Sequence, residues 1–109
     1  MSDDVLGRLA AAIHARRLES AETSYTRQLL DAGPERCAKK LGEEALETVI
    51  AGACQDADAL KAEAADLLYH LLVLLEARGV ALADVLEVLE RREGVSGLAE
   101  KAARAGRRP

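Results

Sequence analysis

The pattern of apolar and polar positions along the first half of the chain is helical. Over residues 3–18 apolar side chains recur three and four positions apart, which predicts an amphipathic helix. After a polar stretch, Ser24 or Thr26 can cap a short helix that ends at Gly33. A proline opens the next segment, where it suits a first helical turn, and a long helix is predicted over residues 34–53.

The second half of the chain predicts three further helices. Asp56 or Asp58 can cap a long helix over residues 58–78. Because this helix is apolar almost all round, we expect it at the centre of the molecule. Another helix is predicted over residues 82–92. The tail is rich in small residues and predicts a short helix, followed from about residue 104 by disorder.

Composition supports a fold made of helices alone. Of the 109 residues 50% are apolar, yet there is no Trp or Phe and only two Tyr, which leaves mainly Leu, Val and Ala for the core. Strands prefer β-branched and aromatic residues, and helices are therefore favoured. We predict one all-α domain over residues 1–109, with two long antiparallel central helices. A chain this small buries a modest fraction of its surface alone, and we expect a homodimer or higher homo-oligomer to complete the core.

Charge and cysteine content narrow the classes of partner. The net charge of −4 argues against nucleic acid, which requires a cationic surface, but is compatible with a local basic pocket. No apolar run reaches membrane-spanning length, and we expect a soluble cytoplasmic protein that binds no membrane. Cys37 and Cys54 lack the spacing and the nearby histidine of a metal or redox site, and we expect both to be small buried residues.

Two pairs of carboxylates lie on the two long predicted helices, and the members of each pair are three residues apart. Glu44 and Glu47 belong to the first helix, and Glu63 and Asp66 belong to the second. Since only a few residues connect these helices, they should be antiparallel neighbours, and both pairs can face one groove. Four carboxylates in a half-buried groove repel one another and raise one another's pKa. A hard divalent cation would remove that penalty.

The types of ligand narrow the choice of metal. Carboxylate oxygens without paired histidines or cysteines suit Mg²⁺, with Mn²⁺ as an alternative, and such a site predicts metal-assisted hydrolysis of a phosphoanhydride. A structural interpretation is that the acidic pairs are solvated faces or salt bridges, as most such pairs are. The position of the second pair on an apolar helix weighs against solvation. A di-iron site is disfavoured because neither Glu47 nor Glu63 has a histidine three residues later.

Several segments of the chain resemble a known family. The motif EExxE at residues 43–47 is followed by a 15-residue spacer and by ExxD at residues 63–66. This signature resembles that of the MazG-like superfamily of all-α nucleoside-triphosphate pyrophosphohydrolases. A narrower resemblance, to the phosphoribosyl-ATP pyrophosphohydrolase family, rests on SYTRQLL, KKLGEEALETVIAG, EAADLLYHLLVLL and SGLAEKAAR. It spans nearly the whole chain. The resemblance implies a MazG-like helical bundle that hydrolyses phosphoribosyl-ATP to phosphoribosyl-AMP and pyrophosphate with Mg²⁺, the second step of histidine biosynthesis.

The resemblance also implies roles for individual acidic residues. The residues that it assigns to the metal are Glu44, Glu47, Glu63 and Asp66. Catalysis is expected from Glu43, Glu44 and Glu47, where Glu43 is either a further metal ligand or the group that polarises the attacking water. His70 aligns with Glu63 and Asp66 along its helix. A lone histidine on an apolar helix is more often a hydrogen-bonded core residue, and we place His70 outside the metal set.

The residues expected to bind the nucleotide are Lys40, Ser24, Tyr25, Thr26 and Lys39. Lys40 precedes Glu44 by one turn, where it can meet a phosphate oxygen or form an ion pair with Glu44. Ser24 and Thr26 can bind phosphate or ribose hydroxyls, but helix capping would explain either one without a ligand. Tyr25 can stack on adenine or pack in the core. Further cations, which can bind a polyanion or simply face solvent, are Arg27 and Arg36.

Two other functions fit the same residues. One is a house-cleaning MazG-like hydrolase of free nucleoside triphosphates, which would share the metal site and differ in the substrate-side segments. The other is a non-catalytic helical dimerisation module whose acidic strip is a partner surface. Turnover of phosphoribosyl-ATP without activity on free nucleotides would separate the phosphoribosyl-ATP hydrolase from the house-cleaning hydrolase. Loss of hydrolysis in a Glu47→Gln variant would exclude the dimerisation module.

Overall fold

The structure is a computed structural model that describes residues 4–93 and 97–106, and in these residues it contains helices and no strand. The α-helices are α1 (Val5–Ala15), α2 (Tyr25–Ala32), α3 (Pro34–Cys54), α4 (Ala57–Ala77), α5 (Leu82–Arg92) and α6 (Gly97–Gly106), and a 3₁₀ turn (Arg16–Leu18) follows α1. The predicted all-α fold is confirmed. Among the described residues, no helix combines the length and the apolar character needed to cross a membrane.

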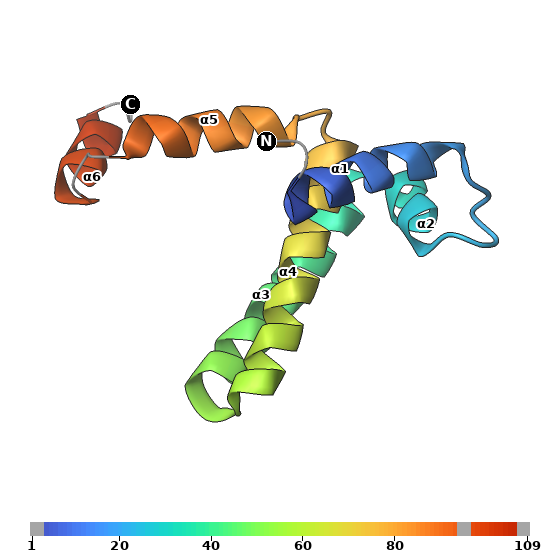
Figure 1. Ribbon diagram of the computed structural model, residues 1–109, viewed down its shortest axis with the longest axis horizontal. Helices are drawn as coiled ribbons and strands as arrows, with labels where there is room; N and C mark the ends of the chain where they lie inside the picture. Colours follow the sequence, from blue (N-terminus) through green and yellow to red (C-terminus); the bar gives the residue numbers. More distant parts are fainter. Residues whose placement is uncertain (1–3, 94–96, 107–109) are drawn as a thin grey trace.

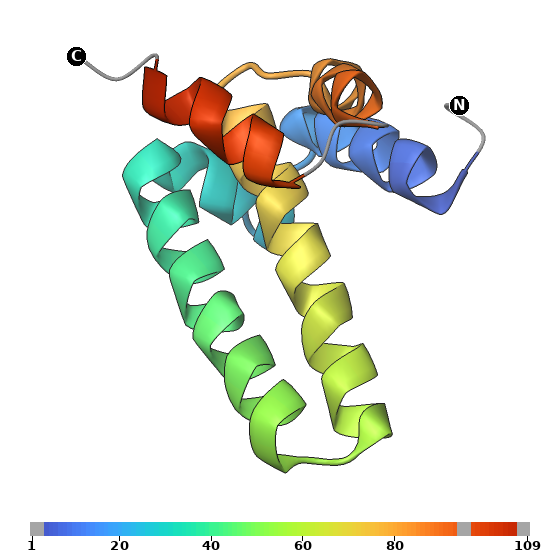
Figure 2. The ribbon, with the colours of Figure 1, turned by 90° about the vertical axis from the view of Figure 1, so that its left-hand side faces the viewer.

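Helices α3 and α4 form a long antiparallel hairpin that carries the predicted acidic pairs. Each is 21 residues long, and the two lie side by side over most of their length (Figure 2). The loop between them is short because Asp56 caps α4, accepting a hydrogen bond of 2.8 Å from the backbone N–H of Ala59. The hairpin projects away from α1 and α2, so that its tip is its most distant part (Figure 1).

The core lies at the opposite end of the hairpin, where α1 and α2 pack on it. Its buried side chains are Ile13, Leu29, Cys37, Leu72 and Val73. The expectation that α4 is central therefore holds for its last two turns, which contain Leu72 and Val73, whereas Leu60 and Leu68, nearer its start, are 38% and 43% exposed. The expected burial of both cysteines was wrong for Cys54, which is exposed because α3 ends there, at the hairpin tip.

Local interactions place α2 against α3. Ser24 caps α2 by accepting a hydrogen bond of 3.1 Å from the backbone N–H of Arg27. The Thr26 hydroxyl is hydrogen-bonded to the Tyr69 hydroxyl of α4. Gly33 both ends α2 and begins α3, and its φ of 97° allows the chain to turn sharply between them. The two helices consequently meet at Gly33, and side chains of both line one cavity, described below.

Helices α5 and α6 extend from the rest of the molecule as an arm. Figure 1 shows α5 running away from the junction of α1 and α4, with α6 at its far end. The bounds of α5 agree with the prediction. Helix α6 continues to Gly106, so the predicted start of disorder near residue 104 was too early. Residues 107–109 lie outside the described part of the chain. The radius of gyration is 16.0 Å. A compact chain of this length would have about 13 Å, so the single chain is open.

Candidate active site

Three carboxylates converge in the groove between α3 and α4. They belong to Glu44, Glu63 and Asp66, and one oxygen of each lies within 4.8 Å of those of the other two. Glu44 and Glu63 are half-buried, and Asp66 is exposed at the mouth of the groove. The antiparallel hairpin thus brings together members of both predicted pairs. We call these three residues the carboxylate cluster.

Glu47, the fourth residue expected to bind the metal, is exposed and is not part of the carboxylate cluster, but it lies beside Glu44. A hydrogen bond with Glu47, burial, and repulsion by the Glu47 charge together raise the pKa of Glu44 above its ordinary value. Such a hydrogen bond requires a proton on one of the two carboxyl groups. With both groups ionised, Oε2 of Glu44 is a buried oxygen without a hydrogen-bond partner. A cation at the cluster would give this oxygen the partner that the protein does not provide.

Thr48 sets the relative position of α3 and α4 beside the carboxylate cluster. Its hydroxyl lies 2.8 Å from the carbonyl oxygen of Glu44 and 3.1 Å from that of Glu63, and it can donate to either one. One side chain therefore links the backbones of two cluster residues across the groove. Sequence reasoning missed Thr48. Its only signal was a polar side chain one turn after Glu44 on the face that carries the acidic residues.

Glu43 and Lys40 form an ion pair at the edge of the site. The Lys40 Nζ lies 3.2 Å from Oε1 of Glu43, so the ion pair anticipated for Lys40 is made with Glu43 and not with Glu44. The hydrogen bond and the charge of Lys40 lower the pKa of Glu43, and the same contact raises the pKa of Lys40. Glu43 is exposed and outside the carboxylate cluster, and it is fully ionised at neutral pH.

His70 is buried beside the carboxylate cluster but is not part of it. Its Nδ1 lies 2.9 Å from the backbone carbonyl oxygen of Asp66 and therefore donates a hydrogen bond to it. The other ring nitrogen faces the Tyr25 hydroxyl at 3.5 Å. The ring also packs edge-on against Tyr69, with 4.9 Å between the ring centroids. The expectation of a hydrogen-bonded core histidine is confirmed.

A cavity of about 540 Å³ opens between α2 and α3, one turn from the carboxylate cluster. It is lined by Tyr25, Gln28, Leu29, Ala32, Arg36 and Lys40. This volume lies within the range that binds small organic ligands. Two of the expected nucleotide-binding residues, Tyr25 and Lys40, line it. Gln28 was missed, because nothing in the sequence distinguishes it from other polar residues of an exposed helical turn.

The other expected nucleotide-binding residues lie elsewhere. Ser24 and Thr26 are 2% and 5% exposed, and their hydroxyls are engaged by the protein, so that helix capping and packing account for them. Lys39 is exposed and is not among the residues that line the cavity. Arg27 is engaged by Asp31 at 2.8 Å and by two backbone carbonyl oxygens at 2.7 Å, which makes it a structural residue.

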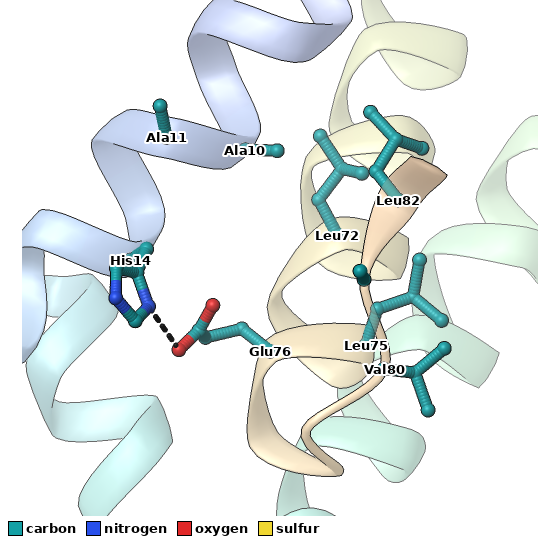
Figure 3. Close-up of a pocket in the computed structure, with 9 residues that line it drawn as sticks. Ala10, Ala11, His14, Leu72, Leu75, Glu76, Val80 and Leu82 are labelled. Carbon is teal, nitrogen blue, oxygen red and sulfur yellow. Dashed lines mark hydrogen bonds and ion pairs between the residues drawn. The ribbon is translucent and has the colours of Figure 1, made fainter. Parts of the chain in front are cut away.

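A second cavity, of about 320 Å³, lies between α1 and the end of α4 (Figure 3). His14 and Glu76 both line it and are in direct contact, with 2.9 Å between Nδ1 and Oε2, and Arg17 also binds the Glu76 carboxylate. Burial raises the pKa of Glu76, but the contacts with Arg17 and His14 outweigh burial and lower it overall. Glu76 is ten residues beyond Asp66 on α4, about 15 Å along the axis. This ion-pair group therefore anchors α1 to α4 and lies away from the carboxylate cluster.

Comparison with known proteins identifies close relatives. The model of a family described as phosphoribosyl-ATP pyrophosphohydrolase matches residues 6–93. A Caulobacter vibrioides protein is 61% identical over 102 residues, which are 94% of each chain. A Dinoroseobacter shibae protein is 57% identical over 100 residues, 92% of this chain and 98% of its own. A Cereibacter sphaeroides protein is 56% identical over 100 residues, 92% of this chain and 97% of its own. All three are named phosphoribosyl-ATP pyrophosphatase.

Proposed function

Since the chain belongs to the phosphoribosyl-ATP pyrophosphohydrolase family, we propose that it hydrolyses phosphoribosyl-ATP to phosphoribosyl-AMP and pyrophosphate, the second step of histidine biosynthesis. The observation that carries this proposal is the convergence of Glu44, Glu63 and Asp66 across the α3–α4 groove. Water attacks one of the two phosphorus atoms that share the anhydride oxygen between the α- and β-phosphates, and the bond from that phosphorus to the shared oxygen breaks. The α-phosphate stays in phosphoribosyl-AMP, and the β- and γ-phosphates leave as pyrophosphate. The water oxygen remains on the attacked phosphorus, and the protons of water pass to the product phosphates or to solvent.

The carboxylate cluster fits a hard divalent cation, which we propose to be Mg²⁺, with Mn²⁺ as the alternative. Glu44, Glu63 and Asp66 would hold it, and Glu47 would hold it from beside Glu44. The fit rests on the donor set, which consists of oxygens only, and on the unpartnered buried Oε2 of Glu44. Bound there, the ion would neutralise phosphate charge and lower the pKa of the attacking water.

Three residues beside the carboxylate cluster are assigned to the substrate and the attacking water. Lys40 lines the cavity one turn before Glu44, where its ammonium group can bind a phosphate oxygen as well as Glu43. Glu43 is ionised and lies outside the carboxylate cluster, which favours the second of its two expected roles, namely accepting a hydrogen bond from the attacking water. Tyr25 is 49% exposed at the cavity and presents its ring to the nucleotide.

We further propose that the active protein is a homodimer. Leu46, Val49 and Ile50 lie on one face of α3 and are 62%, 66% and 43% exposed. A monomer rarely exposes such a cluster of aliphatic side chains, and a second copy of the chain would cover it while closing the open shape.

We also propose that the reaction takes place in the cytoplasm. The thiols of Cys37 and Cys54 would remain free there, as they are in the structure.

A pyrophosphate-release assay with phosphoribosyl-ATP tests the proposal. Hydrolysis should require Mg²⁺, and a Glu63→Gln variant should lose at least about 100-fold in kcat/KM. Saturating Mg²⁺ should raise the free energy of unfolding of the wild-type protein, by about 2.7 kcal/mol at 100 times Kd, and should have no such effect on the variant. Glu87→Gln makes the same charge change on exposed α5 and should alter neither result.

Three outcomes would contradict the proposal. Undiminished turnover without divalent cations would exclude a metal role for the carboxylate cluster. Equal turnover of free nucleoside triphosphates would favour the house-cleaning hydrolase. An absence of turnover of any nucleotide, combined with no stabilisation by Mg²⁺, would favour a helical dimerisation module.

A further inference from the structure

The cavity between α2 and α3 has one cationic wall and one wall that is mostly apolar. Arg36 and Lys40 both line it from α3, and because they are four residues apart they lie on the same helix face. The opposite wall comes from α2, where Leu29 and Ala32 provide the apolar surface. The cavity can therefore take an anionic ligand that also has a less polar face.

The two cations of this cavity differ in their surroundings. Lys40 is paired with Glu43 and lies next to Glu44, at the end of the cavity where the triphosphate would meet the carboxylate cluster. Arg36 is exposed, and it makes no ion pair with any residue in 4–93 or 97–106. It lies about 6 Å farther from the cluster along α3. Its guanidinium group is thus available for an anion that is separate from the triphosphate.

The α2 wall offers groups that suit a sugar. The Gln28 side-chain nitrogen donates a hydrogen bond of 2.7 Å to the carbonyl oxygen of Ala21, which fixes the amide and leaves its oxygen as an acceptor for hydroxyl groups. The Tyr25 ring is half exposed beside it. The cavity thus combines a cation, a fixed acceptor and an aromatic face.

The substrate of the proposed reaction differs from ATP by one ribose with one phosphate, and neither is changed by the reaction. We propose that the cavity binds this phosphoribosyl group, with Arg36 on its phosphate and the Gln28 amide oxygen on its hydroxyls. A guanidinium group suits this role because it can donate two parallel hydrogen bonds to one phosphate. The inference rests on the proposed function and explains how the enzyme distinguishes its substrate from ATP.

The test is the kinetics of an Arg36→Gln variant with phosphoribosyl-ATP and saturating Mg²⁺. The KM should rise by about 10- to 100-fold, the loss expected for a charge-assisted hydrogen bond, while kcat changes less than about twofold. Inhibition by ATP and by pyrophosphate, which lack the phosphoribosyl group, should remain within about twofold of wild type. Arg36→Lys keeps the charge without the paired donors and should recover part of the loss. Arg91→Gln removes the same charge from exposed α5 and serves as the control.

The outcomes separate this inference from the proposed function. If the wild-type enzyme is active and Arg36→Gln leaves the KM unchanged, Arg36 is merely solvated and the phosphoribosyl assignment fails alone. If inhibition by ATP or pyrophosphate weakens as much as phosphoribosyl-ATP binding does, Arg36 contacts the triphosphate, and the assignment also fails. An inactive wild-type enzyme would contradict the proposed function itself.

Discussion

At the scale of single residues, the surroundings of Glu44 in the groove disfavour its ionised form. Its pKa is raised by the hydrogen bond with Glu47, by burial and by repulsion, and one of its oxygens is buried without a partner. The surroundings therefore make Glu44 easier to protonate than an ordinary carboxyl group, whereas a metal ligand must be ionised. Any cation that binds here competes with a proton, and its affinity should increase with pH.

Glu76 shows the opposite electrostatic balance, and its stabilising effect should depend on pH. Its folded-state pKa is lowered below the ordinary value of 4.5 by Arg17 and His14, against the effect of burial. The ionised Glu76 therefore makes its full contribution to the free energy of unfolding above pH 4.5. This contribution is lost as the pH falls from 4.5 through the folded-state pKa. We expect Glu76→Gln to reduce the free energy of unfolding by about 1 kcal/mol at pH 7.

Chemical denaturation of wild type and Glu76→Gln at several pH values measures this contribution. The difference between the two proteins should shrink as the pH is lowered below 4.5. Glu19→Gln, which disrupts an exposed pair at 3.7 Å with Arg16, should change stability much less. A difference that stays constant over the whole pH range would show that Glu76 acts through packing and not through its charge.

At the scale of elements, the junction between α2 and α3 depends on one glycine. Gly33 has φ 97° and ψ 171°, a conformation that other residues rarely adopt, and no neighbouring atom crowds the position of a Cβ. The strain is therefore in the backbone. We expect Gly33→Ala to lower the free energy of unfolding by about 1–3 kcal/mol.

Gly42, in the middle of α3, is the matched control. It also has open space around it but lies within a regular helix, so that Gly42→Ala should raise the free energy of unfolding by about 0.5–1 kcal/mol. Denaturant unfolding of the two variants should give opposite signs. Two changes of the same sign would contradict the assigned role of Gly33.

Helix α4 shows how one element can serve two purposes. Its second half supplies Leu72 and Val73 to the core, while its first half supplies Glu63 and Asp66 to the groove. Apolar residues before these core positions, such as Leu60 and Leu68, remain partly exposed in the single chain. An apolar pattern on all sides of this helix therefore indicates surfaces for more than one partner element.

At the scale of the whole molecule, the open shape and the exposed α3 face lead to a prediction about assembly. Leu46→Asp places a charge on the α3 face that the proposed second copy would cover. The variant should be monomeric, and its mass measured by size-exclusion chromatography with light scattering should be half that of wild type. Leu18→Asp changes a side chain that is 93% exposed at the end of the turn after α1, and it should remain dimeric. A wild-type monomer, or a dimeric Leu46→Asp variant, would refute the proposed interface.

The agreement between sequence and structure differs from feature to feature for physical reasons. Helix α5 was predicted with its observed bounds, and α3 to within one residue, because prolines, glycines and caps act locally. Glu44, Glu63 and Asp66 were found because i, i+3 spacing places each pair on one helix face. Thr48 and Gln28 were missed because their roles depend on a neighbouring helix or on a distant carbonyl group.

The sequence by itself determined the helices, the family and the acidic residues of the groove, because helical periodicity, capping and residue chemistry are properties of short segments. Only the tertiary structure decided which carboxylate lacks a partner, that Lys40 pairs with Glu43, and that Arg36 lines a cavity while Lys39 does not. These features depend on how helices pack against one another. Packing depends on contacts between residues far apart in the chain, which the spacing within one helix does not specify.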